Sequence, residues 1–175
     1  TYLPARTTEV YLRFRQEEKP VDVADERIKH PENMLHRNLR FNAQWMQGRN
    51  VEMNVRCEWV QQKGSGSQSD GILFYQECRY KPMGKPWSIA GRWSVFRTGG
   101  YDSRIYSYEQ DMAGSFSLPA YYSSGMRYYL LLRYRLMKGL DVWLRYGVTS
   151  YEKPAGDVPS PEPSREIKTQ IRWQF

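Results

Sequence analysis

Cysteine, histidine and long apolar runs are all scarce in this chain of 175 residues. Its two cysteines, Cys57 and Cys78, are too few for a disulfide framework and have no zinc-like spacing around them, so we expect reduced thiols and neither a metal nor a cofactor. No stretch of about 18 to 20 uncharged apolar residues is present, which excludes a bundle of membrane helices. Apolar residues also do not recur every three to four positions, so the sequence predicts no amphipathic helix.

Aromatic residues, in contrast, are abundant. Fourteen Tyr, six Trp and six Phe make up 15% of the chain, a content that argues against intrinsic disorder. The 26 Lys and Arg residues outnumber the 19 Asp and Glu residues and give a formal net charge of +7. Because the basic residues alternate with acidic ones and form no run or helix stripe, we expect no nucleic-acid partner for this chain.

The strongest pattern is an alternation of apolar and polar residues with a period of two. Residues 51 to 59 show it most clearly, with Val51, Met53, Val55, Cys57 and Trp59 at the odd positions and Glu52, Asn54, Arg56 and Glu58 at the even ones. A β-strand places two such sets on opposite faces, and a helix does not. With the turn signals between the runs, the pattern predicts eight strands, at about 8–17, 36–47, 50–62, 71–81, 87–98, 126–138, 140–152 and 164–175.

The connections between these strands alternate in length. The long ones span about 18–35, 63–70, 99–125 and 153–163, whereas those at 48–49, 82–86 and near 139 are short. Transmembrane barrels have this asymmetry, with brief periplasmic turns at one end and extended external loops at the other. The sequence therefore predicts an all-β protein, with a single domain over residues 1–175 folded as an antiparallel up-and-down transmembrane β-barrel of eight strands.

The alternation also assigns the two faces of the predicted barrel. Charged side chains of both signs fall on one face and would pair within a narrow lumen: Arg13, Arg15, Arg40, Glu52, Arg56, Glu58, Arg92, Arg133, Arg135, Arg145 and Arg172. Large aromatic side chains on the other face predict girdles at the bilayer boundaries: Trp45, Tyr80, Trp87 and Trp173 near the short turns, and Trp59 and Tyr128 toward the loops. The alternation fits equally well a soluble antiparallel barrel or sandwich that packs its apolar face inward and binds a hydrophobic ligand.

The register of the third strand has an energetic consequence in lipid. A slip of one residue would turn Arg56 toward the hydrocarbon, at a cost of about 2 to 4 kcal/mol near the midplane. We therefore expect this strand to keep one register.

The C-terminus resembles the closing strand of bacterial outer-membrane barrels. That assembly signal has a polar residue, then alternating hydrophobic residues, then a terminal aromatic residue, and Lys168, Trp173 and Phe175 fill these places. Gln170 stands where the signal has a glycine. More broadly, residues 101–175 resemble the C-terminal segment of Bacteroidota outer-membrane proteins that are described as helix-hairpin-helix proteins, through Tyr101 to Glu109, Pro119-Ala120 and Arg127 to Leu130. No helix-hairpin-helix pattern is present in this chain.

The resemblance implies a location in the bacterial outer membrane, with outer-membrane lipid, lipopolysaccharide and other envelope proteins as partners. It also implies that the eight strands are either a complete small barrel or the last eight strands of a larger one. We expect such a porin-like barrel to act as a membrane anchor, a binding platform or part of a transport or secretion assembly.

Residues 99–125 form a long connection that is rich in tyrosine, which indicates an ordered lid or binding loop. Its candidate binding residues are Tyr101, Arg104, Tyr106, Tyr108 and Glu109.

Catalysis has less support in the sequence. Small outer-membrane acyl transferases and lipid A deacylases resemble the predicted architecture and use a His with a Ser and an acid. Here His30 and His36 lie by the first predicted loop, with Asp102, Ser103, Ser107 and Glu109 in another. Since no family motif surrounds a nucleophile, we expect no enzyme activity, and a lipid hydrolase or acyl transferase is the alternative.

Overall fold

A computed structural model describes residues 2–5, 8–25, 28–64, 68–152 and 161–175. Within these ranges the protein contains strands and loops but no helix, and therefore no helix that is long and apolar enough to span a membrane. The expectation of an all-β antiparallel fold is confirmed. The strands are β1 (Tyr2–Ala5), β2 (Thr8–Asp25), β3 (Ile28–Gln47), β4 (Val51–Lys63), β5 (Gln68–Tyr80), β6 (Trp87–Thr98), β7 (Ile105–Tyr106), β8 (Ala120–Tyr121), β9 (Ser124–Met137), β10 (Leu140–Tyr151) and β11 (Ser164–Trp173).

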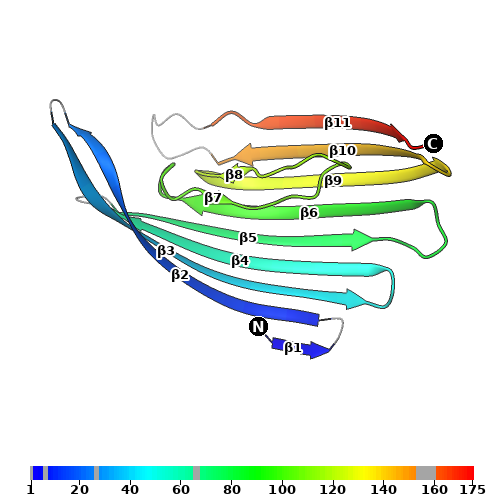
Figure 1. Cartoon of the computed structure of the whole chain (residues 1–175), viewed down its shortest axis with the longest axis horizontal. Helices are drawn as coiled ribbons and strands as arrows, with labels where there is room; N and C mark the ends of the chain where they lie inside the picture. The colour runs from blue at the N-terminus through cyan, green and yellow to red at the C-terminus, as the bar shows by residue number, and fades with distance from the viewer. Residues whose placement is uncertain (1, 6–7, 26–27, 65–67, 153–160) are drawn as a thin grey trace.

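Nine strands form one sheet in the order β1-β2-β3-β4-β5-β6-β9-β10-β11, and every neighbouring pair is antiparallel. Figure 1 shows the strands side by side, with the C-terminus at the end that carries the short turns. Strands β6 and β9 pair directly because residues 99–123 leave the sheet between them. We call residues 99–123 the strap, and β7 and β8 are a two-stranded ribbon within it.

The register gives the sheet two chemically different faces. Directly paired residues share a face, and one such row runs through Phe41, Cys57, Phe74, Val95 and Met126. We call the face of this row the outer face, and the face that the strap covers the inner face. Large apolar side chains of the outer face are exposed: Leu12, Phe14, Leu39, Phe41, Ile72, Phe74, Trp93, Val95, Met126, Tyr128, Leu130, Leu132, Tyr134, Leu144, Tyr146, Ile167 and Ile171.

The buried core lies between the strap and the inner face. One apolar cluster joins Val60, Leu73, Tyr75 and Phe96 of the sheet to Ile105 and Tyr121 of the strap. A second cluster joins Ala90, Tyr129, Leu131 and Trp143 of the sheet to Met112 of the strap. The strap thus supplies the apolar cover that the inner face needs, while the outer face has none.

The sheet is open, which corrects the expectation of a closed barrel within this chain. In the described residues, β11 pairs only with β10, and no pairing joins it to β1 or β2. In Figure 1 the strap, with β7 and β8, runs across β6 and β9, and its side chains pack on the inner face.

The expected loop at 18–35 is wrong in its described part, because residues 18–25 and 28–35 continue β2 and β3. The pairing runs unbroken through Pro20 and Asn33 to Asp25 and Ile28. Figure 1 shows this hairpin extending beyond the other strands. Proline and charged residues in this segment indicate a loop by composition alone. They are compatible with a strand here because β2 lies near the edge of the sheet, where strands tolerate proline and charge.

The three other expected loops have different outcomes. The connection at 63–70 is shorter, since β4 runs to Lys63 and β5 begins at Gln68. The 99–125 segment does not extend away from the sheet as an external loop. Most of it is the strap, which lies on the inner face because Glu109 forms ion pairs with Arg127 and Arg145 of the sheet. Of the loop at 153–163, only residues 161–163 belong to the described part of the chain.

Two tight turns depend on glycine. Gly48, between β3 and β4, has φ +67°, and Gly139, between β9 and β10, has φ +84°. Both values lie in the left-handed region, which costs other residues about 1 to 2 kcal/mol. A Cβ at residue 139 would also lie 2.1 Å from the carbonyl oxygen of Gln174, whereas one at residue 48 would meet nothing within 4 Å.

We expect Gly48→Ala to lower the free energy of unfolding by about 1 kcal/mol, from backbone strain alone. Gly139→Ala should cost distinctly more, because the backbone at Gln174 must also move. Urea denaturation followed by tryptophan fluorescence measures both. Equal losses for the two variants would contradict the close approach at Gly139.

Candidate functional site

The inner face gathers the charged residues that the alternation assigned to a lumen. The register places all eleven of them on this face, although Arg13, Arg15, Arg135 and Arg172 remain exposed on it. The six expected girdle aromatics all lie on the outer face, among them Tyr80 and Trp87, whose rings contact edge to face at 5.4 Å.

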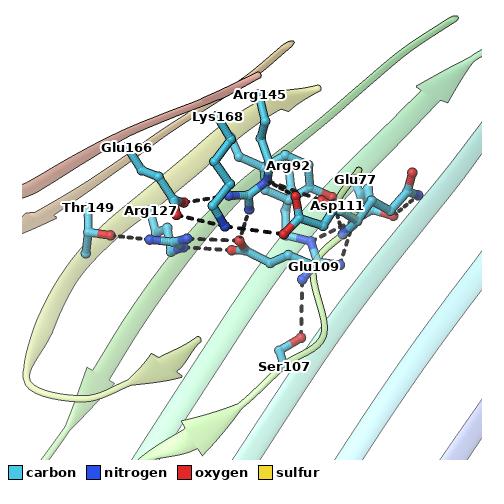
Figure 2. A network of polar contacts seen from close by, with 12 residues as sticks. Glu77, Arg92, Ser107, Glu109, Asp111, Arg127, Arg145, Thr149, Glu166 and Lys168 are labelled. Carbon is cyan, nitrogen blue, oxygen red and sulfur yellow. Dashed lines mark hydrogen bonds and ion pairs between the residues drawn. The ribbon is translucent and has the colours of Figure 1, made fainter. Parts of the chain in front are cut away.

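Glu109 of the strap is the centre of the largest polar network, and its side chain is 0% exposed. Its Oε1 accepts hydrogen bonds from Arg127 Nε at 2.8 Å and from Tyr121 Oη at 2.8 Å. Its Oε2 accepts from Arg127 Nη2 at 3.0 Å and from Arg145 Nη2. Figure 2 shows the two guanidinium groups, from β9 and β10, pointing toward this carboxylate from the sheet. One strap residue is therefore bound to two strands at once.

The environment of Glu109 keeps it ionised. Burial by itself disfavours the charge, but the hydrogen bonds and charges of Arg127, Tyr121 and Arg145 outweigh burial and lower the pKa of Glu109 below its ordinary value of 4.5. Burial raises the pKa of the Tyr121 phenol, which therefore stays neutral and donates its proton to the carboxylate.

A second network lies next to the first, around Glu77 of β5. Arg92 Nε donates to Glu77 Oε2 at 2.8 Å, and Tyr129 Oη donates to the same oxygen at 2.7 Å. From the strap, Gln110 Nε2 donates to Glu77 Oε1 at 2.9 Å, and Ser107 Oγ accepts from Arg92 Nη1 at 3.3 Å. This buried Arg–Glu pair thus has its remaining donors and acceptors satisfied by the strap, as buried ion pairs require.

The strap also reaches the last strand. Lys168 of β11 lies 3.3 Å from Asp111 Oδ2 and 2.8 Å from Glu166 Oε1, and Glu166 in turn lies 2.7 Å from Arg145 Nη1. Figure 2 shows these side chains closing a chain of contacts from Glu166 to Asp111. Arg145, Glu166 and Lys168 are therefore neutralised by one another and by the strap.

The start of the strap lies against a glycine of β5. A Cβ on Gly71 would lie 2.5 Å from the carbonyl oxygen of Ser103, so only glycine permits this approach. Ser103 Oγ then donates to the Asp70 carbonyl at 3.1 Å and lies 2.7 Å from Ser69 Oγ.

The expected binding loop is divided between two environments. Tyr101, Tyr106 and Tyr108 are exposed, whereas Glu109 is buried against the sheet. Arg104 lies between the exposed tyrosines and donates from Nε to Tyr106 Oη at 2.7 Å. The loop thus anchors itself through Glu109 and presents tyrosines to the open side.

The sequence analysis did not predict which side chains of the strap face the sheet, although the residue pattern of the strap contains this information. Residues 103, 105, 107 and 109 are buried and 106 and 108 are exposed, so the period of two continues through the strap. The alternation Ser-Ile-Ser-Glu carried this information, but the small polar residues Ser103 and Ser107 concealed it.

Of the residues expected as catalytic candidates, His36 and Asp102 line one cavity in the described structure, whereas Ser103 and Ser107 do not line it. His36 of β3 makes no hydrogen bond there to Ser103 or Ser107, which instead bond to Asp70 and Arg92. The side chain of His30 lies outside the described residues. The expected assembly-signal residues Lys168, Trp173 and Phe175 lie at and beyond β11, where Trp173 and Phe175 are exposed and contact each other edge to face.

No family model, no curated protein and no solved structure matches the chain.

We expect Glu109→Gln to lower the free energy of unfolding by about 3 kcal/mol, because the buried Arg127 loses its one ion-pair partner among the described residues and Arg145 keeps only Asp111 and Glu166. Asp141→Asn is the matched control, since Asp141 also binds two arginines, Arg133 at 2.9 Å and Arg135 at 3.2 Å, but at the surface. It should cost less than about 1 kcal/mol. Urea denaturation of both variants measures the difference, and similar losses would refute the central role of Glu109.

The same carboxylate should make stability depend on acid. Because folding lowers the pKa of Glu109, its ionised form stabilises the fold above the unfolded value of 4.5, and this stabilisation is lost as the pH falls through the lower folded value. The stability difference between wild type and Glu109→Gln should be constant between about pH 6 and 8 and shrink below about pH 4. Denaturation curves at several pH values test this, and a difference that does not change on acidification would contradict it.

Proposed function

We propose that this sheet is part of the wall of a bacterial outer-membrane β-barrel, which acts as a membrane anchor and binding platform or as part of a transport or secretion assembly, without catalysis of its own. The observation that carries the proposal is the distribution of side chains between the two faces. Arg145 and Glu58 are buried on the inner face, while Leu130 is 48% exposed on the outer face.

This distribution fits lipid better than water. A soluble ligand-carrying barrel would pack the row of Phe41, Phe74 and Val95 inward and leave the ionic residues wet, and the sheet does the reverse. In water an exposed apolar surface extending across neighbouring strands is unfavourable and rare in monomers. In hydrocarbon the same surface costs nothing, and paired charges on the inner face never meet lipid.

The open sheet favours a larger barrel over a complete eight-stranded one. Unpaired backbone groups at the edges of β2 and β11 would each cost several kcal/mol in hydrocarbon. Further strands must then join both edges to close a cylinder. A wider cylinder also leaves room for the strap, because eight strands enclose space for side chains only. We therefore favour the interpretation that these strands are part of a larger barrel.

In such a barrel the strap would narrow the lumen. Its underside is held by Glu109, Gln110 and Asp111, and its free side carries Tyr101 and Tyr108. An ordered segment fixed to the wall is suited to selecting what enters or binds in the lumen, since rigid scaffolds position binding groups well. Outer-membrane lipid and lipopolysaccharide are the expected surroundings of the outer face, and other envelope proteins the expected partners.

Two substitutions on one face of β9 test the membrane assignment. Leu130 lies in the middle of the strand and Leu136 near its short-turn end, and both are exposed on the outer face. In a bilayer, Leu130→Arg should cost about 2 to 4 kcal/mol and Leu136→Arg about 0 to 1 kcal/mol. Folding of both variants into phospholipid vesicles, followed by urea titration, measures these costs.

The soluble alternative gives a different result in the same experiment. In water both leucines are already wet, so both arginine variants would change stability by less than about 0.5 kcal/mol. Equal small effects, together with extraction of the protein from cells without detergent and the absence of a heat-modifiable gel shift, would falsify the membrane proposal.

A further inference from the structure

A cavity of about 530 Å³ lies between the inner face of β2, β3 and β4 and the residues of the strap around Arg104. Its volume is within the range of pockets that hold small organic ligands. None of the residues of the Glu109 and Glu77 networks lines this cavity, so the cavity is separate from both networks. Tyr106, an exposed tyrosine of the strap, is among its lining residues.

Most of the charges that line the cavity are already paired. Arg40 donates to both carboxylate oxygens of Glu58, from Nε at 2.8 Å and from Nη2 at 2.7 Å. Arg15 and Lys19 both pair with Glu17. Arg104 and Asp102, which also lines the cavity, differ from them, because neither forms an ion pair within 4.0 Å among the described residues.

The Arg104 side chain is nevertheless held in place. Its Nε donates to Tyr106 Oη at 2.7 Å and its Nη1 to the Tyr101 carbonyl at 3.0 Å. Its guanidinium carbon also lies 4.2 Å from the centre of the Tyr101 ring. These three contacts orient the group before any ligand is bound, and Nη2 makes no hydrogen bond among the described residues. Such a preorganised guanidinium is suited to a carboxylate.

The rest of the lining favours a hydroxylated molecule over a bare inorganic anion. Tyr106 offers an aromatic surface, Ile105 and Met34 are apolar, and Asn38 and Gln62 bring amide groups. Sugars combine these needs, since their C–H faces pack on aromatic rings and their hydroxyl groups bond to amides. We infer that this cavity binds an acidic carbohydrate of about disaccharide size, with its carboxylate on Arg104. The inference deepens the binding-platform role proposed above and rests on it for the lumenal location.

Isothermal titration of the detergent-solubilised protein tests the site, with the disaccharide of glucuronic acid and N-acetylglucosamine as the probe. The neutral disaccharide of two N-acetylglucosamine units should bind at least about 10-fold more weakly, and inorganic phosphate should not compete, because Arg104 alone does not make the site. Arg104→Ala should weaken binding of the acidic probe by about 10- to 100-fold. Arg104→Lys keeps the charge but loses the planar fork, and should weaken binding by several-fold.

Arg97→Ala is the matched control. Arg97 is an exposed arginine on the outer face of β6, paired in register with Ile72, and its removal changes the net charge by the same amount. It should leave the dissociation constant unchanged. A heat-modifiable gel shift equal to that of the wild type shows that each variant is folded.

The outcomes separate this inference from the proposed function. Folded, membrane-inserted protein that does not bind the acidic probe, or that binds the neutral one equally well, overturns the cavity assignment and leaves the barrel standing. An Arg97→Ala variant that loses as much affinity as Arg104→Ala shows general charge attraction and also overturns it. Arg104-dependent binding by a protein that is soluble without detergent supports the cavity and refutes the barrel.

Discussion

The ionic contact between Glu109 and the arginines Arg127 and Arg145 is the interaction on which the rest of this structure depends. Without the strap carboxylate, two guanidinium groups of neighbouring strands would face each other in a buried space. With it, the strap is fixed to β9 and β10, and its apolar side chains complete the only core that the described residues form. The stability of the fold and the position of the tyrosines thus depend on the same carboxylate.

This arrangement reverses the usual order of a small β protein. In a soluble sandwich, apolar residues stabilise the interior and charges are spread over the surface, where they contribute little. Here the buried ionic pairs lie inside beside a small apolar core, where the loss of one partner is costly, and many large apolar side chains lie on the outer face, where their contribution depends on the solvent. The exposed apolar outer face is the observation on which the proposed membrane location rests.

The fold and the site differ in how far the sequence predicts them. Alternation predicted the eight long strands and their faces, because successive side chains of a strand point to opposite faces of the sheet. It failed for β2 and β3, where Pro20 and a run of charges looked like a loop but continue a strand pair. It also gave no partner for Glu109, since Tyr121, Arg127 and Arg145 lie 12, 18 and 36 residues away in the chain.

The sequence by itself determined the strand pattern, the short turns and the division of the residues into an ionic and an apolar set, because these follow from local periodicity and from glycine at turns. Only the tertiary structure decided that the sheet stays open, that residues 99–123 turn back onto the inner face, and that Arg104 is left without an ion pair beside a cavity. The physical reason is that charge pairing and closure are long-range properties. They depend on which strands become neighbours, and no local pattern of residues encodes that choice.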